Sequence, residues 1–268
     1  MLRFKVLGPL EVYRDDCVRT PSAPKLRRVL GLLLLRADSV VDMQSVIAEL
    51  WGDRPPMSAV TTTQTYIYQL RKELNRDTQR LITKPPGYLL RLDGDELDAR
   101  SCEKLIDKGN RLLEEGRPSE ASDVLSEALA LWKGPPLANT PCGVLLQAHA
   151  VHLEELRIRA LATRIEADMR LGRARTLIAE LRSLVVLHPL NEWFHARLIE
   201  ALYRAGRRGE ALRAYQDMRM TLRDELGLEP AAPLQRLQRS ILDGAEPALD
   251  QDTERNGLVS PVGSLGLK

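Results

Sequence analysis

The first hydrophobic positions of the chain alternate with polar ones. Residues 2–13 place apolar side chains at every second position, with a break at Gly8 and Pro9. A period of two is typical of a half-buried β-strand, and Asp15 and Asp16 supply a turn after it. We therefore expect the chain to open with a small antiparallel sheet.

After Pro24 the hydrophobic period becomes helical, and three helices are expected before residue 76. Pro24 suits the first turn of the first helix, and Asp42 is a candidate N-cap for a short second helix that Gly52 ends. The third helix is expected from Ser58 to Asn75. At 100° per residue its apolar arc comprises Val60, Thr63, Ile67, Leu70 and Leu74.

Two short apolar runs follow the third helix. Leu81–Ile82 and Tyr88–Leu92 are separated by Thr83–Gly87, which contains two prolines and a glycine. This arrangement predicts a β-hairpin. A sheet, three helices and a hairpin, in that order, predict an α+β winged helix-turn-helix domain over residues 1–92.

From residue 93 onward the pattern is helical throughout. Gly172-Arg173 and Gly206-Arg207 lie 34 residues apart between helix pairs, and His188-Pro189 resembles the end of a tetratricopeptide unit. We therefore expect an all-α, tetratricopeptide-like helical-repeat domain over 93–243 and a disordered polar tail over 244–268. Helices are expected near 102–113, 121–132, 143–171, 177–187, 194–205, 211–226 and 234–241.

The charge of the chain is unevenly distributed. The net charge is +2, but residues 1–92 carry 15 Lys and Arg against 9 Asp and Glu, whereas the rest carries 24 against 28. A basic N-terminal part and an acidic remainder indicate that the N-terminal part binds a polyanion.

Several classes of protein are disfavoured by composition. The longest apolar run, which contains Gly31–Leu35, is far shorter than the roughly 20 residues of a membrane-spanning helix, and the first ten residues lack a signal-peptide core. We therefore expect an intracellular, cytoplasmic protein. Cys17, Cys102 and Cys142 are scattered, which favours buried thiols over a disulfide framework or zinc site.

The third predicted helix carries the candidate chemistry. Its exposed arc lacks acids and is rich in hydroxyl, amide and basic groups, which suit base edges and phosphates. An ordinary solvated helix with a run of threonines is the alternative interpretation. The candidate DNA-binding residues on this helix are Thr61, Thr62, Thr65, Tyr68, Gln69, Arg71 and Lys72.

Two further groups of residues extend this candidate surface. Thr83 and Lys84 in the hairpin turn would lie beside the groove of bound DNA, as the residues of a wing do. Lys25, Arg27 and Arg28 begin the first helix and are candidate phosphate ligands, although a solvated helix edge explains each equally well.

No catalytic constellation is found. The chain has no Gly-rich phosphate loop, no G-x-S-x-G and no H-E-x-x-H motif, and we expect neither an enzyme nor a cofactor. His149 and His152 have the spacing of a helical metal pair, but without a completing ligand they are better explained as core or interfacial histidines.

Many short motifs follow one another along residues 2–243. They are Leu7-Gly8-Pro9-Leu10, Leu50-Trp51-Gly52, Pro55-Pro56, Ser58-Ala59, Gln64-Thr65-Tyr66-Ile67, Leu70-Arg71, Pro86–Leu90, Leu131–Leu137, Leu153–Arg157, His188–Glu192, Ala201–Arg207 and Glu225–Pro230. Their order and spacing resemble those of the Streptomyces antibiotic regulatory protein family. One departure from the family pattern is Asn139–Cys142, where an acidic residue is more usual, so the role of this loop is open.

The resemblance implies an OmpR-type DNA-binding domain followed by a bacterial transcriptional activation domain. Such proteins activate secondary-metabolite gene clusters by binding direct repeats near the −35 element, with two copies on DNA, and by contacting RNA polymerase and its sigma factor. It also implies that Ser58–Asn75 is the recognition helix and Thr83–Tyr88 the wing. Larger relatives append ATPase or phosphopeptide-binding domains, which we expect to be missing here.

The alternative function is a helical-repeat adaptor that binds another protein.

Overall fold

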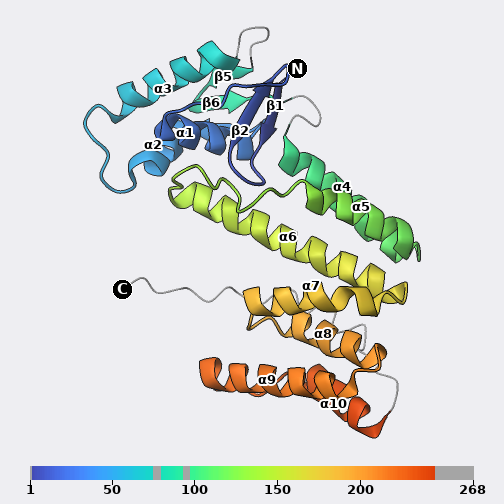
Figure 1. Cartoon of the computed structure of the whole chain (residues 1–268). Helices are drawn as coiled ribbons and strands as arrows, with labels where there is room; N and C mark the ends of the chain where they lie inside the picture. The colour runs from blue at the N-terminus through green and yellow to red at the C-terminus, as the bar shows by residue number, and fades with distance from the viewer. Residues whose placement is uncertain (1, 75–79, 93–96, 245–268) are drawn as a thin grey trace. The chain divides into compact units, whose positions relative to one another are not determined.

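The computed structural model describes residues 2–74, 80–92 and 97–244 (Figure 1). The chain forms two compact units, Met1–Leu161 and Ala162–Lys268, and each is described by itself. The predicted end of the third helix at Asn75 and the predicted disordered tail fall outside the described residues, apart from Gly244.

The first unit opens with the predicted antiparallel sheet, in the order β1-β2-β3. Its strands are β1 (Leu2–Lys5), β2 (Glu11–Arg14) and the two-residue β3 (Cys17–Val18). Phe4 and Val12 face each other across β1 and β2, and both are buried. Asp15 and Asp16 have φ angles of 48° and 64° in the turn, a conformation that Asp tolerates better than most residues.

The three predicted helices are α1 (Pro24–Leu35), α2 (Met43–Trp51) and α3 (Ala59–Leu74). Pro24 lies in the first turn of α1, as expected. The Asp42 carboxylate accepts a hydrogen bond from the Ser45 backbone N–H at 2.8 Å, which confirms Asp42 as the N-cap of α2.

The wing belongs to a second antiparallel sheet, in the order β4-β6-β5. Its strands are β4 (Val40–Asp42), β5 (Leu81–Lys84) and β6 (Gly87–Leu90). The predicted five-residue turn was too long, because Thr83 and Lys84 continue the pairing with β6 and leave Pro85-Pro86 as the turn. A Cβ at Gly87 would lie 1.9 Å from the Val41 carbonyl oxygen, so only glycine allows β4 and β6 to pair here.

Three further helices complete the first unit. They are α4 (Asp98–Glu114), α5 (Pro118–Ala130) and the beginning of α6 (Val144–Arg170). The prediction that the second of these helices reaches Trp132 was wrong. Helix α5 ends at Ala130, and the buried Trp132 lies in the segment that follows it.

Residues 1–92 share their core with α4, α5 and α6. A single hydrophobic cluster runs from Phe4 and Leu30 to Ile106 and Leu153. Backbone hydrogen bonds also join the two parts, from the Lys133 N–H to the Leu7 carbonyl at 2.7 Å and from Leu137 to Val6 at 3.1 Å. The winged helix is therefore packed within a larger unit.

The second unit contains the end of α6 and the helices α7 (Ala174–Leu187), α8 (Glu192–Arg204), α9 (Arg208–Leu226) and α10 (Ala232–Asp243). Gly172 and Gly206 have φ angles of 72° and 79° at the ends of helices, which explains glycine at both repeat positions. Trp193 and Phe194 are buried core residues. Within the described residues, no helix is both long and apolar enough to cross a membrane.

Candidate nucleic-acid interface

Helix α3 buries one face and presents the predicted polar face. Thr61, Thr65, Tyr68, Gln69 and Lys72 are exposed, and Thr62 is half-buried. Tyr68 is 69% exposed although it is a large aromatic side chain. A solvent-facing aromatic beside amide and hydroxyl groups is available for contact with a base.

One position of the predicted arc on α3 was wrong. Val60 is 46% exposed, and the buried stripe begins instead at Ala59. Ala59 lies four residues before Thr63, which lies four before Ile67, so these three share the inner face and Val60 turns away from it.

The polar groups on the exposed face of α3 are mostly uncommitted. Thr65 Oγ1 donates to the Thr61 carbonyl at 3.0 Å, so the Thr65 oxygen keeps lone pairs that can accept. Within the described part of the chain, the side chains of Tyr68, Gln69 and Lys72 make no hydrogen bond. These groups are therefore free to bind a ligand.

Arg71 joins α3 to the wing. Its Nε donates to the Leu81 carbonyl at 3.0 Å, its Nη2 donates to Thr83 Oγ1 at 2.7 Å, and its guanidinium lies 5.8 Å from the Tyr88 ring centroid. The arrangement fixes β5 against α3. Lys84 is exposed at the end of β5 and makes no side-chain hydrogen bond to a described residue.

The three basic residues of α1 differ in their contacts. Lys25 is exposed, with its Nζ 5.4 Å from the Trp51 ring centroid. Arg27 donates to the carbonyls of Asn139, Pro21 and Ser22, and Arg28 donates to those of Pro141, Glu49 and Leu50. The two arginines thus have structural partners inside the first unit.

The loop that departs from the family pattern is a structural connection. The Asn139 side chain accepts from the Leu10 N–H at 2.8 Å and donates to the Leu10 carbonyl at 3.1 Å. Together with the contacts of Arg27 and Arg28, this pairing holds the loop against residues of the winged helix.

Sequence reasoning missed two residues that position this region. The Arg14 Nη2 donates to the Glu73 carbonyl at 2.7 Å, near the end of α3, and no sequence signal pointed to this contact. Glu49 is 1% exposed and accepts from the N–H groups of Leu145 and Leu146 at the start of α6. Its position three residues after Val46, on the apolar side of α2, was an available signal.

The three cysteines differ in burial. Cys102 is buried, as predicted, but Cys142 is half-buried and Cys17 is exposed in a two-residue edge strand that packs little against the core. In the described ranges, no group of three or more His, Cys, Asp or Glu side chains is arranged to hold a metal ion.

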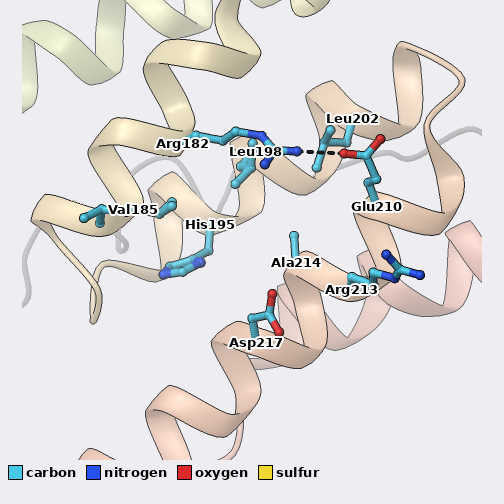
Figure 2. Close-up of a pocket in the computed structure, with 10 residues that line it drawn as sticks. Arg182, Val185, His195, Leu198, Leu202, Glu210, Arg213, Ala214 and Asp217 are labelled. Atoms are coloured by element: carbon cyan, nitrogen blue, oxygen red, sulfur yellow. Dashed lines mark hydrogen bonds and ion pairs between the residues drawn. The ribbon is translucent and has the colours of Figure 1, made fainter.

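A groove in the second unit is a further candidate binding surface (Figure 2). Its volume is about 390 Å³, within the range typical of ligand pockets. Leu198 and Leu202 are buried apolar residues of this groove, and at its rim Arg182 pairs with Glu210 at 2.7 Å. It is lined by Arg182, Val185, Val186, His195, Leu198, Leu202, Glu210, Arg213, Ala214 and Asp217.

Comparison with known families accounts for both parts of the chain. Residues 97–242 match the family model described as "Bacterial transcriptional activator domain", and residues 19–90 match "Transcriptional regulatory protein, C terminal". The second match covers the three helices and the wing. The first covers α4 to α10.

Individual relatives are similar over nearly the whole chain. The regulatory protein DnrI of Streptomyces peucetius is 39% identical over 97% of both chains. The regulatory protein AfsR of Streptomyces coelicolor is 39% identical over 92% of this chain but only 25% of its own length. A solved structure of Mycobacterium tuberculosis EmbR in complex with a low-affinity phosphopeptide superposes with a TM-score of 0.89 and 32% identity, over 96% of this chain and 69% of that one.

Proposed function

Because the chain belongs to the Streptomyces antibiotic regulatory protein family, whose members are transcriptional regulators rather than enzymes, we propose that it is a sequence-specific DNA-binding activator of a secondary-metabolite gene cluster. One observation carries the proposal. The exposed face of α3 has one acid, Glu73 near the end of the helix, and its amide, phenol and ammonium groups are unpaired among the described residues. This face lies beside a wing that ends in the exposed Lys84.

The residues divide into base contacts and phosphate contacts. Gln69 can pair bidentately with adenine, and Tyr68 and the predicted threonines can contact base edges and thymine methyl groups. Lys25, Lys72 and Lys84 supply free ammonium groups for phosphates. Arg71 and Thr83 act mainly by positioning the wing, and the Nη2 groups of Arg27 and Arg28 remain for the phosphate contacts predicted for them.

A small winged domain reads only a short site, so specific affinity requires two copies of the protein. We propose that these bind direct repeats near the −35 element. In this proposal both parts of the chain act together in activating transcription. Residues 1–92 form the DNA-binding domain, and residues 93–243 form the activation domain. DNA as the partner places the protein in the cytoplasm at the nucleoid.

The DNA-binding proposal is tested by gel-shift titrations on repeat-bearing promoter DNA. Gln69→Ala is expected to reduce the preference for the specific site about tenfold, because a bidentate base contact contributes about 1–3 kcal/mol of discrimination. Lys84→Ala is expected to weaken specific and random DNA alike. Lys108→Ala, on the exposed side of α4, is the matched control and should change neither.

Indifference of the wild-type protein to DNA sequence would contradict the proposal of a specific regulator. If Gln69→Ala and Lys84→Ala change the preference for the specific site over random DNA to the same extent, the division into base and phosphate contacts is wrong.

We assign the contact with RNA polymerase, including its sigma factor, to the groove of Figure 2. Arg213 and Asp217 lie one turn apart on α9, and their exposed side chains make no hydrogen bond in the described part of the chain. These two charges flank an apolar floor, so they favour a polymerase segment with an apolar side chain between an acidic and a basic one.

Transcription in vitro with purified polymerase holoenzyme tests this assignment. Arg213→Glu is expected to reduce activation severalfold and to leave promoter affinity unchanged, because the change lies outside the DNA-binding residues. Arg175→Glu, an exposed reversal on α7 outside the groove, is the matched control. Full activation by Arg213→Glu would contradict the assignment.

A helical-repeat adaptor is the second candidate function, and the same groove favours it. An adaptor is expected to retain a non-polymerase partner in a pull-down while lacking affinity for promoter DNA. Specific DNA binding by the purified chain would exclude this alternative as the main function.

A further inference from the structure

A second cavity lies in the first unit, between α1, α4 and α6. Its volume is about 260 Å³, slightly below the usual range for drug-sized ligands, so it suits a small molecule. One part of its lining is apolar and the other is polar and charged. The lining residues are Leu34, Leu35, Leu97, Ala99, Arg100, Glu103, His149, His152 and Leu153.

His149 is the least satisfied polar group of this cavity. The side chain is half-buried, and its ring makes no hydrogen bond to any described residue. Its pKa is lowered, first by burial and then by Arg36 and His152, while Glu49 acts in the opposite direction. Arg36 therefore places a permanent positive charge within electrostatic reach of the ring.

The other charged groups near the cavity are an arginine in an ion pair and one acid of the lining. Arg100 on α4 is paired with Asp38 at 2.7 Å and also donates to the Ala37 carbonyl. Arg36, at the end of α1, is half-buried, and its side chain forms no hydrogen bond or ion pair with a described residue. Glu103 is exposed and is the acid in the lining, so the positive charge available to a bound anion comes from Arg36 and from the imidazoles when they are protonated.

A metal ion does not fit this site. His149 and His152 lie three residues apart on α6, but the described residues offer no third ligand in a suitable arrangement. An anion with an apolar body matches both parts of the lining, since a carboxylate can face the imidazoles and the apolar remainder can pack on Leu34, Leu97 and Leu153.

We propose that this cavity binds a small organic anion, a carboxylate with a compact apolar body, held by His149 and His152 with Arg36 nearby. The site would take its walls from α1 of the winged helix and from α4 and α6 of the helical part. A ligand there would contact both sequence domains within one compact unit. The test below involves no DNA, so it succeeds or fails separately from the proposed function.

Benzoate is the probe, because it joins a carboxylate to a compact ring. The full-length protein, labelled at its histidines, is titrated with benzoate at pH 6 and followed by NMR. Saturable shifts of the His149 and His152 resonances are expected, with a dissociation constant in the millimolar range or below. The pKa of His149 should rise on binding, because an anion favours the protonated imidazole.

Two control ligands separate charge from shape. Benzamide has nearly the same shape without the charge and is expected to bind at least tenfold more weakly. Inorganic phosphate carries charge without an apolar body and should bind more weakly than benzoate. Equal binding of benzamide would overturn the anion assignment, and equal binding of phosphate would overturn the assignment of an apolar body.

Variants locate the site. His149→Gln and Arg36→Gln should each weaken benzoate at least fivefold, whereas Lys108→Gln removes one positive charge elsewhere on α4 and should leave the affinity unchanged. Circular dichroism melts show whether each variant remains folded. If His149→Gln does not fold, Arg36→Gln tests the site in its place. Non-saturable shifts, or equal affinity in every folded variant, would overturn the proposal.

Discussion

Asp98 shows at the scale of one residue how burial and hydrogen bonding compete. Its carboxylate accepts from the N–H groups of Val6 and Leu7, at 2.9 to 3.1 Å. Burial nevertheless raises its pKa from the usual 3.8 to about 6, because loss of water disfavours the charged form more than these hydrogen bonds favour it. The carboxyl group therefore makes the folded state sensitive to pH.

A raised pKa means that the folded chain binds the proton more tightly than the unfolded chain. This contribution to stability is complete below pH 3.8 and is lost as the pH rises through about 6. We expect the stability of the wild type relative to Asp98→Asn to fall by up to about 3 kcal/mol between pH 4 and pH 7. Urea unfolding of both proteins at several pH values measures this difference in the free energy of unfolding. If the free energies of the two proteins change with pH in parallel, the prediction is wrong.

Thr63 carries a buried hydroxyl without a hydrogen bond. The residue is 0% exposed, and its Oγ1 has no partner among the described residues. Valine has the same shape without the polar atom, so Thr63→Val is expected to stabilise the protein by about 1 kcal/mol and raise its Tm by about 2–4 °C. Thr61→Val, at an exposed position of the same helix, should give no increase. A lower Tm for Thr63→Val would show that the hydroxyl is needed.

Residue-scale prediction from the sequence succeeded where the cause was local. The cap at Asp42 and the exposed polar face of α3 follow from spacing along a single helix. The partners of Arg71 lie on β5, and those of Arg28 on α2 and on the loop after α5. Helical periodicity contains no information about such contacts, so a guanidinium predicted to face phosphate can prove to be committed elsewhere.

At the scale of elements, the start of α6 depends on a carboxylate from α2. Glu49 supplies acceptors to N–H groups that have no partner within their own helix, including that of Gly143. A Cβ at Gly143 would lie 2.3 Å from the Glu49 carbonyl oxygen, so glycine is required for this approach. The contact fixes α6 against the winged helix.

Glu49→Gln is expected to destabilise the protein by about 2–4 kcal/mol. The glutamine amide has only one acceptor oxygen, and its NH₂ would face backbone N–H groups in a buried site. Thermal and urea unfolding measure the loss. Glu127→Gln, an exposed change on α5, should stay within about 0.5 kcal/mol of the wild type. A similarly small effect of Glu49→Gln would contradict the capping role.

Elements that display a hydrophobic period were predictable, and strand β4 was not. The helix expected over 143–171 is α6, Val144–Arg170. Strand β4 has only three residues and exists because β6, far along the chain, pairs with it. Such a strand has too few positions to display a period, and its stability comes from its partner.

At the scale of the whole molecule, the sequence divides after residue 92, whereas the first compact unit extends to Leu161. We therefore expect a fragment of residues 1–92 to melt at least 10 °C below a fragment of residues 1–161, because the shorter fragment lacks Asp98, Glu49's partners on α6 and much of the shared core. Trp51 fluorescence follows both transitions. Equal melting temperatures would show that the winged helix folds independently.

The internal use of Arg27, Arg28 and Arg71 has a consequence for counterions on DNA. A protein releases roughly 0.9 counterion for each phosphate that it neutralises. Arg71 is committed to positioning the wing, so the predicted phosphate contacts of each copy are Lys25, Lys72, Lys84 and the Nη2 groups of Arg27 and Arg28. Two copies would then release about nine ions, so the affinity for DNA should depend on salt less steeply than the positive charge of residues 1–92 suggests.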